Sequence, residues 1–183
     1  AKISDKVAVV ESLLNRVDAL AIGGGMAATF FRAKGWETGA SLVETDAVPF
    51  AGKAMQHAQA RGVKLLLPTD VVVTLLPAGA KDPSKLKGDL ATQVVPADRV
   101  PAGCAIVDVG PATLEAFSAE LCGAKTVFWN GPMGIFEVPA FSQGTRKLVD
   151  TLTGLTDATT IVGGGSTAEV VETLGLEGRF SHV

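Results

Sequence analysis

Residues 125–137, KTVFWNGPMGIFE, combine a strand-like segment with an abrupt turn. The apolar run 126–129 is typical of a buried strand, and Asn130-Gly131-Pro132 ends it. In an open α/β sheet, ligands bind in the crevice outside the carboxyl ends of the strands. Glycine lets the backbone approach a ligand closely, and proline stiffens the turn. We interpret this stretch as a binding loop, and Glu137 is the one charge in the run of apolar and small residues that follows Pro132.

Two Gly-Gly-Gly turns elsewhere in the chain point to the same edge of the sheet. Residues 23–25 lie between a predicted strand at 18–22 and a predicted helix at 26–34. Residues 163–165 lie between a predicted strand at 159–162 and a helix that runs to residue 174. Such turns expose the N-terminal amides of a helix and suit a phosphate or a purine face. Either turn alone could serve packing, but two turns in one sheet favour a ligand site.

The remaining segments alternate between strand and helix patterns. Further strands are predicted at 63–67, 71–76, 92–95 and 105–109, and further helices at 4–17, 48–60, 112–121 and 139–152. Residues 78–90 carry glycine, proline and lysine and are expected to form an exposed excursion. We predict a single domain over residues 1–183 with an α/β fold: a three-layer, doubly wound, mostly parallel sheet of Rossmann-like type with helices on both faces.

Composition excludes several classes of protein. No apolar run reaches the roughly 18 residues that a membrane-spanning helix needs, so we expect no membrane partner. A net charge of −3 argues against a nucleic-acid surface. Cys104 and Cys122 lack the spacing of a metal site, and we expect a reducing, cytoplasmic compartment.

Three charged residues stand where charge is unfavourable. Lys2 and Lys6 flank the start of the helix predicted at 4–17, where the helix dipole disfavours cations. A bound anion would explain them; solvated lysines on an exposed turn are the alternative. Asp108 lies inside the apolar strand 105–109. It either belongs to a metal or phosphate site or caps a neighbouring loop, and we favour the cap.

The order of the motifs resembles one known family. KISDK (2–6), IGGGMA (22–27), VDVGP (107–111), FWNGPMGIFE (128–137), IVGGGST (161–167) and SHV (181–183) follow one another as they do in phosphoglycerate kinases. The resemblance covers essentially the whole chain, and matches only the C-terminal, nucleotide-binding half of that enzyme. It implies an N-terminal, phosphoglycerate-binding domain as partner, which these residues do not contain.

The resemblance assigns roles around the phosphates and ribose of a bound nucleotide. Lys2 and Lys6 look like the catalytic lysines that neutralise the phosphates. Asn130 resembles the amide that reaches the phosphates, Pro132 the ribose contact, and Glu137 the carboxylate that accepts hydrogen bonds from the ribose hydroxyls.

The resemblance also implies an adenine pocket and a phosphate-side loop. The adenine wall would be Gly23, Gly24 and Gly25, lined by Leu42 and Ile135. The phosphate-side loop would include Gly164, Gly165 and Thr167.

Two residues depart from the family pattern. Ser166 stands where the family usually has an aspartate facing the metal of the Mg-nucleotide, and Ile106 stands where a glycine often lies beside the adenine. Mg²⁺ is held mainly by phosphates and waters with one or two carboxylates, and a serine hydroxyl is a neutral, weaker ligand. We therefore assign no protein residue as a metal ligand, and expect nucleotide binding to persist while Mg²⁺ dependence shifts.

The implied activity is phosphoryl transfer between 1,3-bisphosphoglycerate and ADP, with Mg²⁺-bound ADP or ATP as nucleotide. We expect this chain to be monomeric and to be inactive without the other domain. One alternative is a nicotinamide-binding domain, suggested by Gly23, Gly25 and Ala28 with Glu44 or Asp46 further on. The other is a nucleotide-binding module without catalysis. A P-loop kinase is excluded because G-x-x-x-x-G-K-[ST] does not occur.

Overall fold

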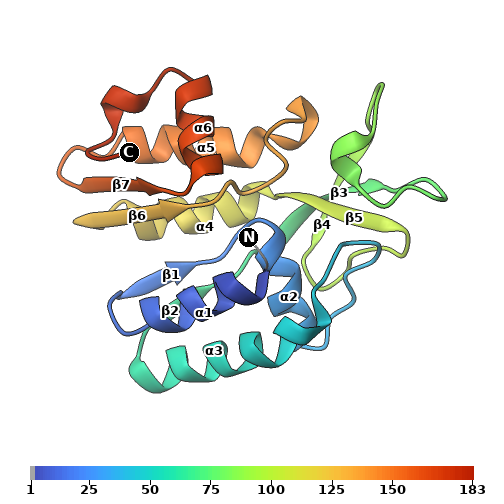
Figure 1. Ribbon diagram of the computed structural model, residues 1–183, viewed down its shortest axis with the longest axis horizontal. Helices are drawn as coiled ribbons and strands as arrows, with labels where there is room; N and C mark the ends of the chain where they lie inside the picture. Colours follow the sequence, from blue (N-terminus) through green and yellow to red (C-terminus); the bar gives the residue numbers. More distant parts are fainter. Residues whose placement is uncertain (1–2) are drawn as a thin grey trace.

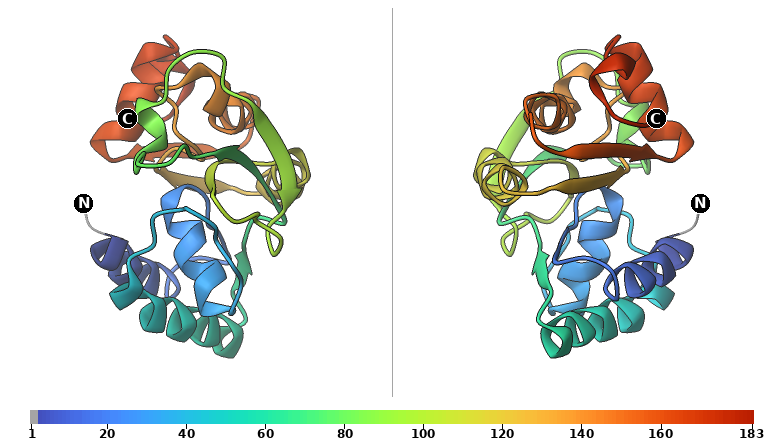
Figure 2. Two further views of the ribbon diagram at one scale, coloured as in Figure 1. Left: turned by 90° about the vertical axis from the view of Figure 1, so that its right-hand side faces the viewer. Right: turned by 90° about the vertical axis from the view of Figure 1, so that its left-hand side faces the viewer.

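The strands form a central layer between two layers of helices (Figures 1 and 2). The computed structural model describes residues 3–183. Two apolar cores, one on either side of the strands, give the three-layer arrangement. The predicted three-layer α/β fold with helices on both faces is confirmed. No helix within residues 3–183 has both the length and the hydropathy to cross a bilayer.

One helical layer is built from the N-terminal third of the chain. Helices α1 (Ile3–Leu13), α2 (Gly25–Ala33) and α3 (Val48–Arg61) share a core with β1 (Ala19–Ala21) and β2 (Lys64–Leu66). Phe30 and Phe31 are fully buried there. Helix α3 buries Ala51, Ala54 and Ala58, whose spacing of three and four residues puts them on one face. Small side chains on that face allow the helices to approach closely.

The second helical layer comes from the C-terminal third. Helices α4 (Pro111–Leu121), α5 (Gln143–Thr153) and α6 (Gly165–Thr173) pack with β6 (Thr126–Asn130) and β7 (Thr159–Gly163). Burial alternates along β6: Val127 and Trp129 face this core, while Phe128 is exposed on the other side.

Strand pairing is parallel in two ladders and antiparallel in the third. β1 pairs with β2, and β6 with β7, in parallel. β3 (Asp70–Leu75) runs antiparallel to both β4 (Thr92–Pro96) and β5 (Cys104–Val109), so this ladder is an exception to the parallel pairing that was predicted. The cause is the connection between β3 and β4, which returns without the helical crossover that parallel strands need.

That connection, residues 76–91, contains only a short 3-10 helix at Pro83–Lys85. We call residues 76–91 the arm. All of its residues from 78 to 90 are exposed or half-buried, which confirms the predicted exposed excursion.

Some predicted boundaries were wrong. Helix α1 ends at Leu13, four residues before the predicted end, and the helix expected at 139–152 is divided into a 3-10 turn at Pro139–Phe141 and α5.

Candidate functional site at the carboxyl edge of the strands

A cleft of about 570 Å³ lies where β1, β5 and β6 end, between the glycine turn before α2 and the loop after β6. Helix α1 forms one side of it, through residues between Lys6 and Leu13, and the arm contributes at another. A ligand crevice was predicted at this edge, because the turns that follow parallel strands gather there.

The cleft brings together most of the predicted site residues. Those that line it are Lys6, Gly23, Gly24, Gly25, Leu42, Asn130, Pro132, Ile135, Glu137 and Ser166. Within the described part of the chain, Gly164, Gly165 and Thr167 are not among the lining residues. Lys2 lies outside the described residues. Ile106, noted as a departure from the family pattern, also lines the cleft, and its N–H donates to the Ser41 hydroxyl at 2.9 Å.

The loop after β6 is held from behind by three different elements. The Gly131 N–H donates to Thr167 Oγ1 at 2.7 Å, and the Met133 N–H donates to Thr145 Oγ1 at 2.9 Å. The Ile135 N–H donates to the carbonyl oxygen of Val107, on β5, at 3.0 Å. A loop whose amides are paired in this way presents its outer side chains in a defined geometry.

The glycine turn before α2 packs directly on that loop. The Gly24 N–H donates to the Met133 carbonyl oxygen at 3.1 Å, and Gly24 has a φ of 67°. A Cβ on Gly24 would lie 2.8 Å from the Pro132 carbonyl oxygen, and one on Gly23 would lie 2.5 Å from Met133 Sδ. These two glycines therefore serve close packing between the cleft walls, in addition to lining the cleft.

The second glycine turn supports the loop rather than facing the cleft. Gly164 has a φ of 89°, and a Cβ there would lie 2.6 Å from Asn130 Oδ1. Thr167 is 0% exposed, and its hydroxyl accepts the Gly131 amide. Of this turn, only Ser166 reaches the cleft surface.

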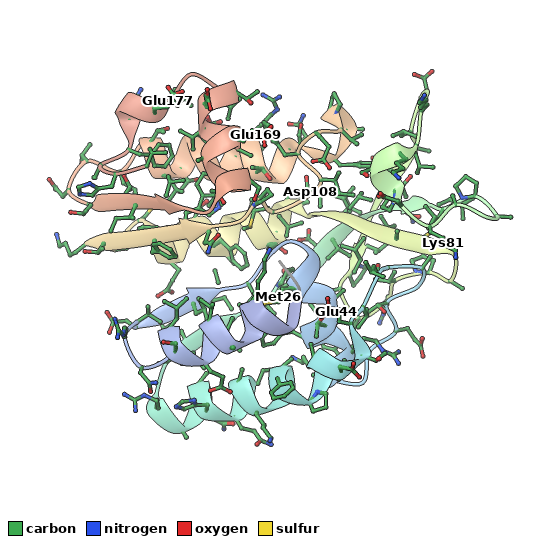
Figure 3. The ribbon with its side chains drawn as sticks, viewed as in Figure 1. Met26, Glu44, Lys81, Asp108, Glu169 and Glu177 are labelled. Carbon is green, nitrogen blue, oxygen red and sulfur yellow. The ribbon has the colours of Figure 1, made fainter. Side chains whose placement is uncertain are left out.

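Asp108 lies near the centre of the molecule (Figure 3) and is one of the residues that line the floor of the cleft. It is 3% exposed, and its two oxygens accept hydrogen bonds from the N–H groups of Val109 and Gly144, each at 2.8 Å. Gly144 lies in the first turn of α5, so Asp108 caps that helix; the favoured cap interpretation describes this geometry. Burial raises the pKa of Asp108 to about 6, although the two hydrogen bonds act in the opposite direction.

Several residues that line the cleft were not predicted from the sequence. Asp82, Pro83 and Ser84 come from the arm, and no local signal indicated that the arm would reach the cleft. Phe128 is 49% exposed and also lines the cleft. Strand alternation could have revealed it, because Val127 and Trp129 point to the opposite face.

The chemistry of the lining suits a phosphorylated ligand. Lys6 supplies positive charge, the glycine turn lies at the start of α2, and apolar side chains such as Leu42, which is 82% exposed, offer a surface for a ring. Among residues 3–183, no three His, Cys, Asp or Glu side chains are placed to hold a metal ion together. This donor set fits a metal that is carried mainly by phosphates and water.

Comparisons with known proteins agree with one another. A family model described as phosphoglycerate kinase matches residues 1–183. The phosphoglycerate kinase of Chloroflexus aurantiacus is 48% identical over 185 aligned positions, which cover the whole of this chain and 44% of that protein. The phosphoglycerate kinase of Thermus thermophilus is 46% identical over 183 positions, covering 45% of its length.

Solved structures show the same relationship. The phosphoglycerate kinase from Coxiella burnetii matches with a TM-score of 0.89 at 38% identity, and the match covers all of this chain and 44% of that one. The enzyme from Pyrococcus horikoshii matches with a TM-score of 0.75 at 25% identity. This chain spans less than half the length of these relatives.

Proposed function

The chain belongs to the phosphoglycerate kinase family, and from this premise we propose that it is the nucleotide-binding half of such an enzyme. In the intact protein it binds ADP or ATP, while a phosphoryl group moves between 1,3-bisphosphoglycerate and ADP to give 3-phosphoglycerate and ATP in glycolysis. Residues 1–183 form one nucleotide-binding domain, and the expected setting is the cytoplasm.

The observation that carries the proposal is the composition of the cleft. One cavity of about 570 Å³ is lined by a lysine, a glycine turn at a helix start, an amide side chain, apolar residues and a carboxylate. A nucleotide needs positive charge and polar groups around its phosphates, an apolar surface for its base, and a hydrogen-bond acceptor for the hydroxyls of its ribose. We assign Lys6, Asn130 and Ser166 to the phosphate end, Pro132 and Glu137 to the ribose, and Gly23, Gly24, Gly25, Leu42 and Ile135 to the base. Lys2 joins the phosphate end by family resemblance alone.

Gly164 and Thr167 contribute to the proposed site from behind the loop, and Gly165 begins helix α6 next to Ser166. Since the Thr167 hydroxyl is occupied by the Gly131 amide, its contribution is to orient the loop that carries Asn130.

In this mechanism the chain positions the nucleotide and neutralises the charge of its phosphates, and none of its side chains reacts covalently. A transferring phosphoryl group spreads charge over its oxygens, and lysine side chains and helix N-termini stabilise that charge. Lys6 supplies the lysine here, and Ser166 is the part of the start of α6 that lines the cleft. Mg²⁺ bound with the nucleotide would supply further neutralisation of phosphate charge, and Ser166 is the residue of this chain that would face it.

The acceptor's site lies in the family's other domain, so the two domains must close to bring the substrates together. This chain alone should be a monomer that binds nucleotide without turning it over. It has no assigned nucleic-acid or membrane partner.

Calorimetric titration with Mg-ADP, and with NAD as control, tests the binding role. We expect saturable binding of Mg-ADP and none of NAD; the reverse result would overturn the proposal. Catalysis is tested by adding a separately produced N-terminal domain of a related phosphoglycerate kinase and assaying ATP formation from 1,3-bisphosphoglycerate. If Mg-ADP binds but no combination of domains forms ATP, only a binding module remains.

A further inference from the structure

Asp108 is a buried ionisable residue to which the proposed mechanism gives no role. It lies at the meeting point of β5, the first turn of α5 and the loop after β6 (Figure 3). A Cβ on Gly134 would lie 2.6 Å from Asp108 Oδ1, and a Cβ on Gly144 would also collide with that oxygen. The loop and the helix therefore both approach the carboxylate as closely as a backbone can.

The first turn of α5 connects this carboxylate to the loop after β6. Helix α5 has no side-chain cap from its own Ser142, and the Gly144 N–H instead donates to Asp108 Oδ2 at 2.8 Å. The next residue, Thr145, is fully buried, and its hydroxyl accepts the Met133 N–H at 2.9 Å. Met133 in turn accepts the Gly24 N–H, so the connection reaches both cleft walls.

We propose that Asp108 is a positioning residue for the nucleotide cleft: its ionised carboxylate holds the first turn of α5, and Thr145 then holds the loop in its binding geometry. The inference rests on the proposed nucleotide-binding function.

The chemistry requires the ionised form. Two N–H donors, of Val109 and Gly144, face the two oxygens of Asp108. A proton on either oxygen removes the negative charge and makes the carboxyl group a weaker acceptor, so the hydrogen bonds from the two N–H groups weaken. The same holds for Asp108→Asn, whose amide group keeps the shape of the side chain. Burial raises the pKa of Asp108 to about 6, so this weakening begins close to neutral pH.

Other charges near the carboxylate do not substitute for it. The elements packed around Asp108, together with the cleft, carry further ionisable residues: Asp70 on β3, Arg146, Lys147 and Asp150 on α5, Glu137 on the loop, and Lys6 on α1. In the described part of the chain, none of these forms an ion pair with Asp108.

The chain offers a matched control. Asp70 caps α4 as Asp108 caps α5: its oxygens accept the N–H groups of Ala112 at 3.0 Å and Thr113 at 2.9 Å. Asp70 does not line the cleft. Asp70→Asn should therefore disturb a helix start without moving the nucleotide site.

The test measures Mg-ADP affinity by calorimetry between pH 5.5 and 7.5, and amide hydrogen exchange at Met133 and Gly134. We expect Asp108→Asn to weaken binding about tenfold at pH 7.5 and to accelerate exchange at both amides, while Asp70→Asn changes neither. Wild-type affinity should fall toward pH 5.5 more steeply than that of Asp108→Asn, because only the wild type loses the ionised group. Asp70→Asn reveals the part of that fall that comes from titration of the nucleotide itself.

A second pair of variants keeps the test decisive if Asp108→Asn does not fold. Thr145→Val removes the hydroxyl that accepts the Met133 N–H and should weaken Mg-ADP binding. Thr145→Ser keeps a hydroxyl at this position and should bind Mg-ADP as the wild type does. The inference would be overturned if Asp108→Asn matched the wild type in Mg-ADP affinity and in amide exchange at Met133 and Gly134. It would also be overturned if Asp70→Asn lost as much Mg-ADP affinity as Asp108→Asn does. With Asp108→Asn unfolded, equal affinity in Thr145→Val and wild type would overturn it. A wild-type chain that binds no Mg-ADP would instead overturn the proposed function, and this inference with it.

Discussion

The backbone N–H of Gly24 donates a hydrogen bond to the carbonyl oxygen of Met133 at 3.1 Å. This contact joins the turn before α2 to the loop after β6, which are more than 100 residues apart in the chain. The Met133 N–H is bound on its other side by Thr145. Met133 thus joins the two cleft walls through its backbone and is itself held by α5.

Gly24→Ala should destabilise the fold and weaken nucleotide binding together. Its φ of 67° is unfavourable for alanine, and the new Cβ would lie 2.8 Å from the Pro132 carbonyl oxygen. We expect a loss of about 1–3 kcal/mol in the free energy of unfolding, measured by urea denaturation. Gly62→Ala is the control, because Gly62 has a φ of 70° with open space around it. That variant should cost about 1 kcal/mol and leave Mg-ADP affinity unchanged. Equal affinity in the Gly24 variant and wild type would contradict this account of the wall contact.

Glu137→Ala should weaken Mg-ADP binding without changing the fold. Glu137 is exposed at the cleft, where a carboxylate can accept hydrogen bonds from ribose hydroxyls. We expect a loss of about 1 kcal/mol in binding free energy by calorimetry, since solvent competes for an exposed group. Glu169→Ala, at an exposed position of α6 that does not line the cleft, should bind as the wild type does (Figure 3). An unchanged dissociation constant of Glu137→Ala for Mg-ADP would contradict the proposal that Glu137 binds the ribose.

Asp108 should make the folded state less stable as pH rises. Its pKa in the folded chain, about 6, lies above the ordinary value of 3.8, so the folded chain holds the proton more tightly than the unfolded chain does. The stabilisation is complete below pH 4 and is lost as pH rises through about 6, a change of about 3 kcal/mol. Urea unfolding of wild type and Asp108→Asn at several pH values checks this. The wild type should lose stability relative to the variant between pH 4 and 7, and parallel pH profiles would refute the prediction.

Ser166→Asp should strengthen the dependence of nucleotide binding on Mg²⁺. Ser166 lies exposed at the cleft, and a carboxylate there adds a ligand of the kind that Mg²⁺ prefers. Titration of ADP at increasing Mg²⁺ concentration should show a larger gain in affinity for the variant than for wild type. Thr173→Asp, at the other end of α6, serves as a control for added negative charge. Identical metal titrations for wild type and Ser166→Asp would argue against a metal contact at this position.

Much of the architecture could be predicted because its determinants are local. The strands and helices follow from hydrophobic periodicity and from glycine and proline at their ends. The antiparallel ladder of β3 with β4 and β5 could not be predicted in the same way. Pairing direction depends on how a connection returns through space, and the arm between β3 and β4 has a pattern that does not specify its path.

The sequence by itself determined the family, the three-layer fold and the edge of the strands at which Gly23, Asn130 and Glu137 meet. Only the tertiary structure decided which polar side chains face the cleft and which support it. Thr167 binds Gly131 and Asp108 binds Gly144, in each case across 36 residues of sequence. A buried hydroxyl or carboxylate must find a partner wherever the packed chain supplies one, and local patterns carry no information about that distant partner.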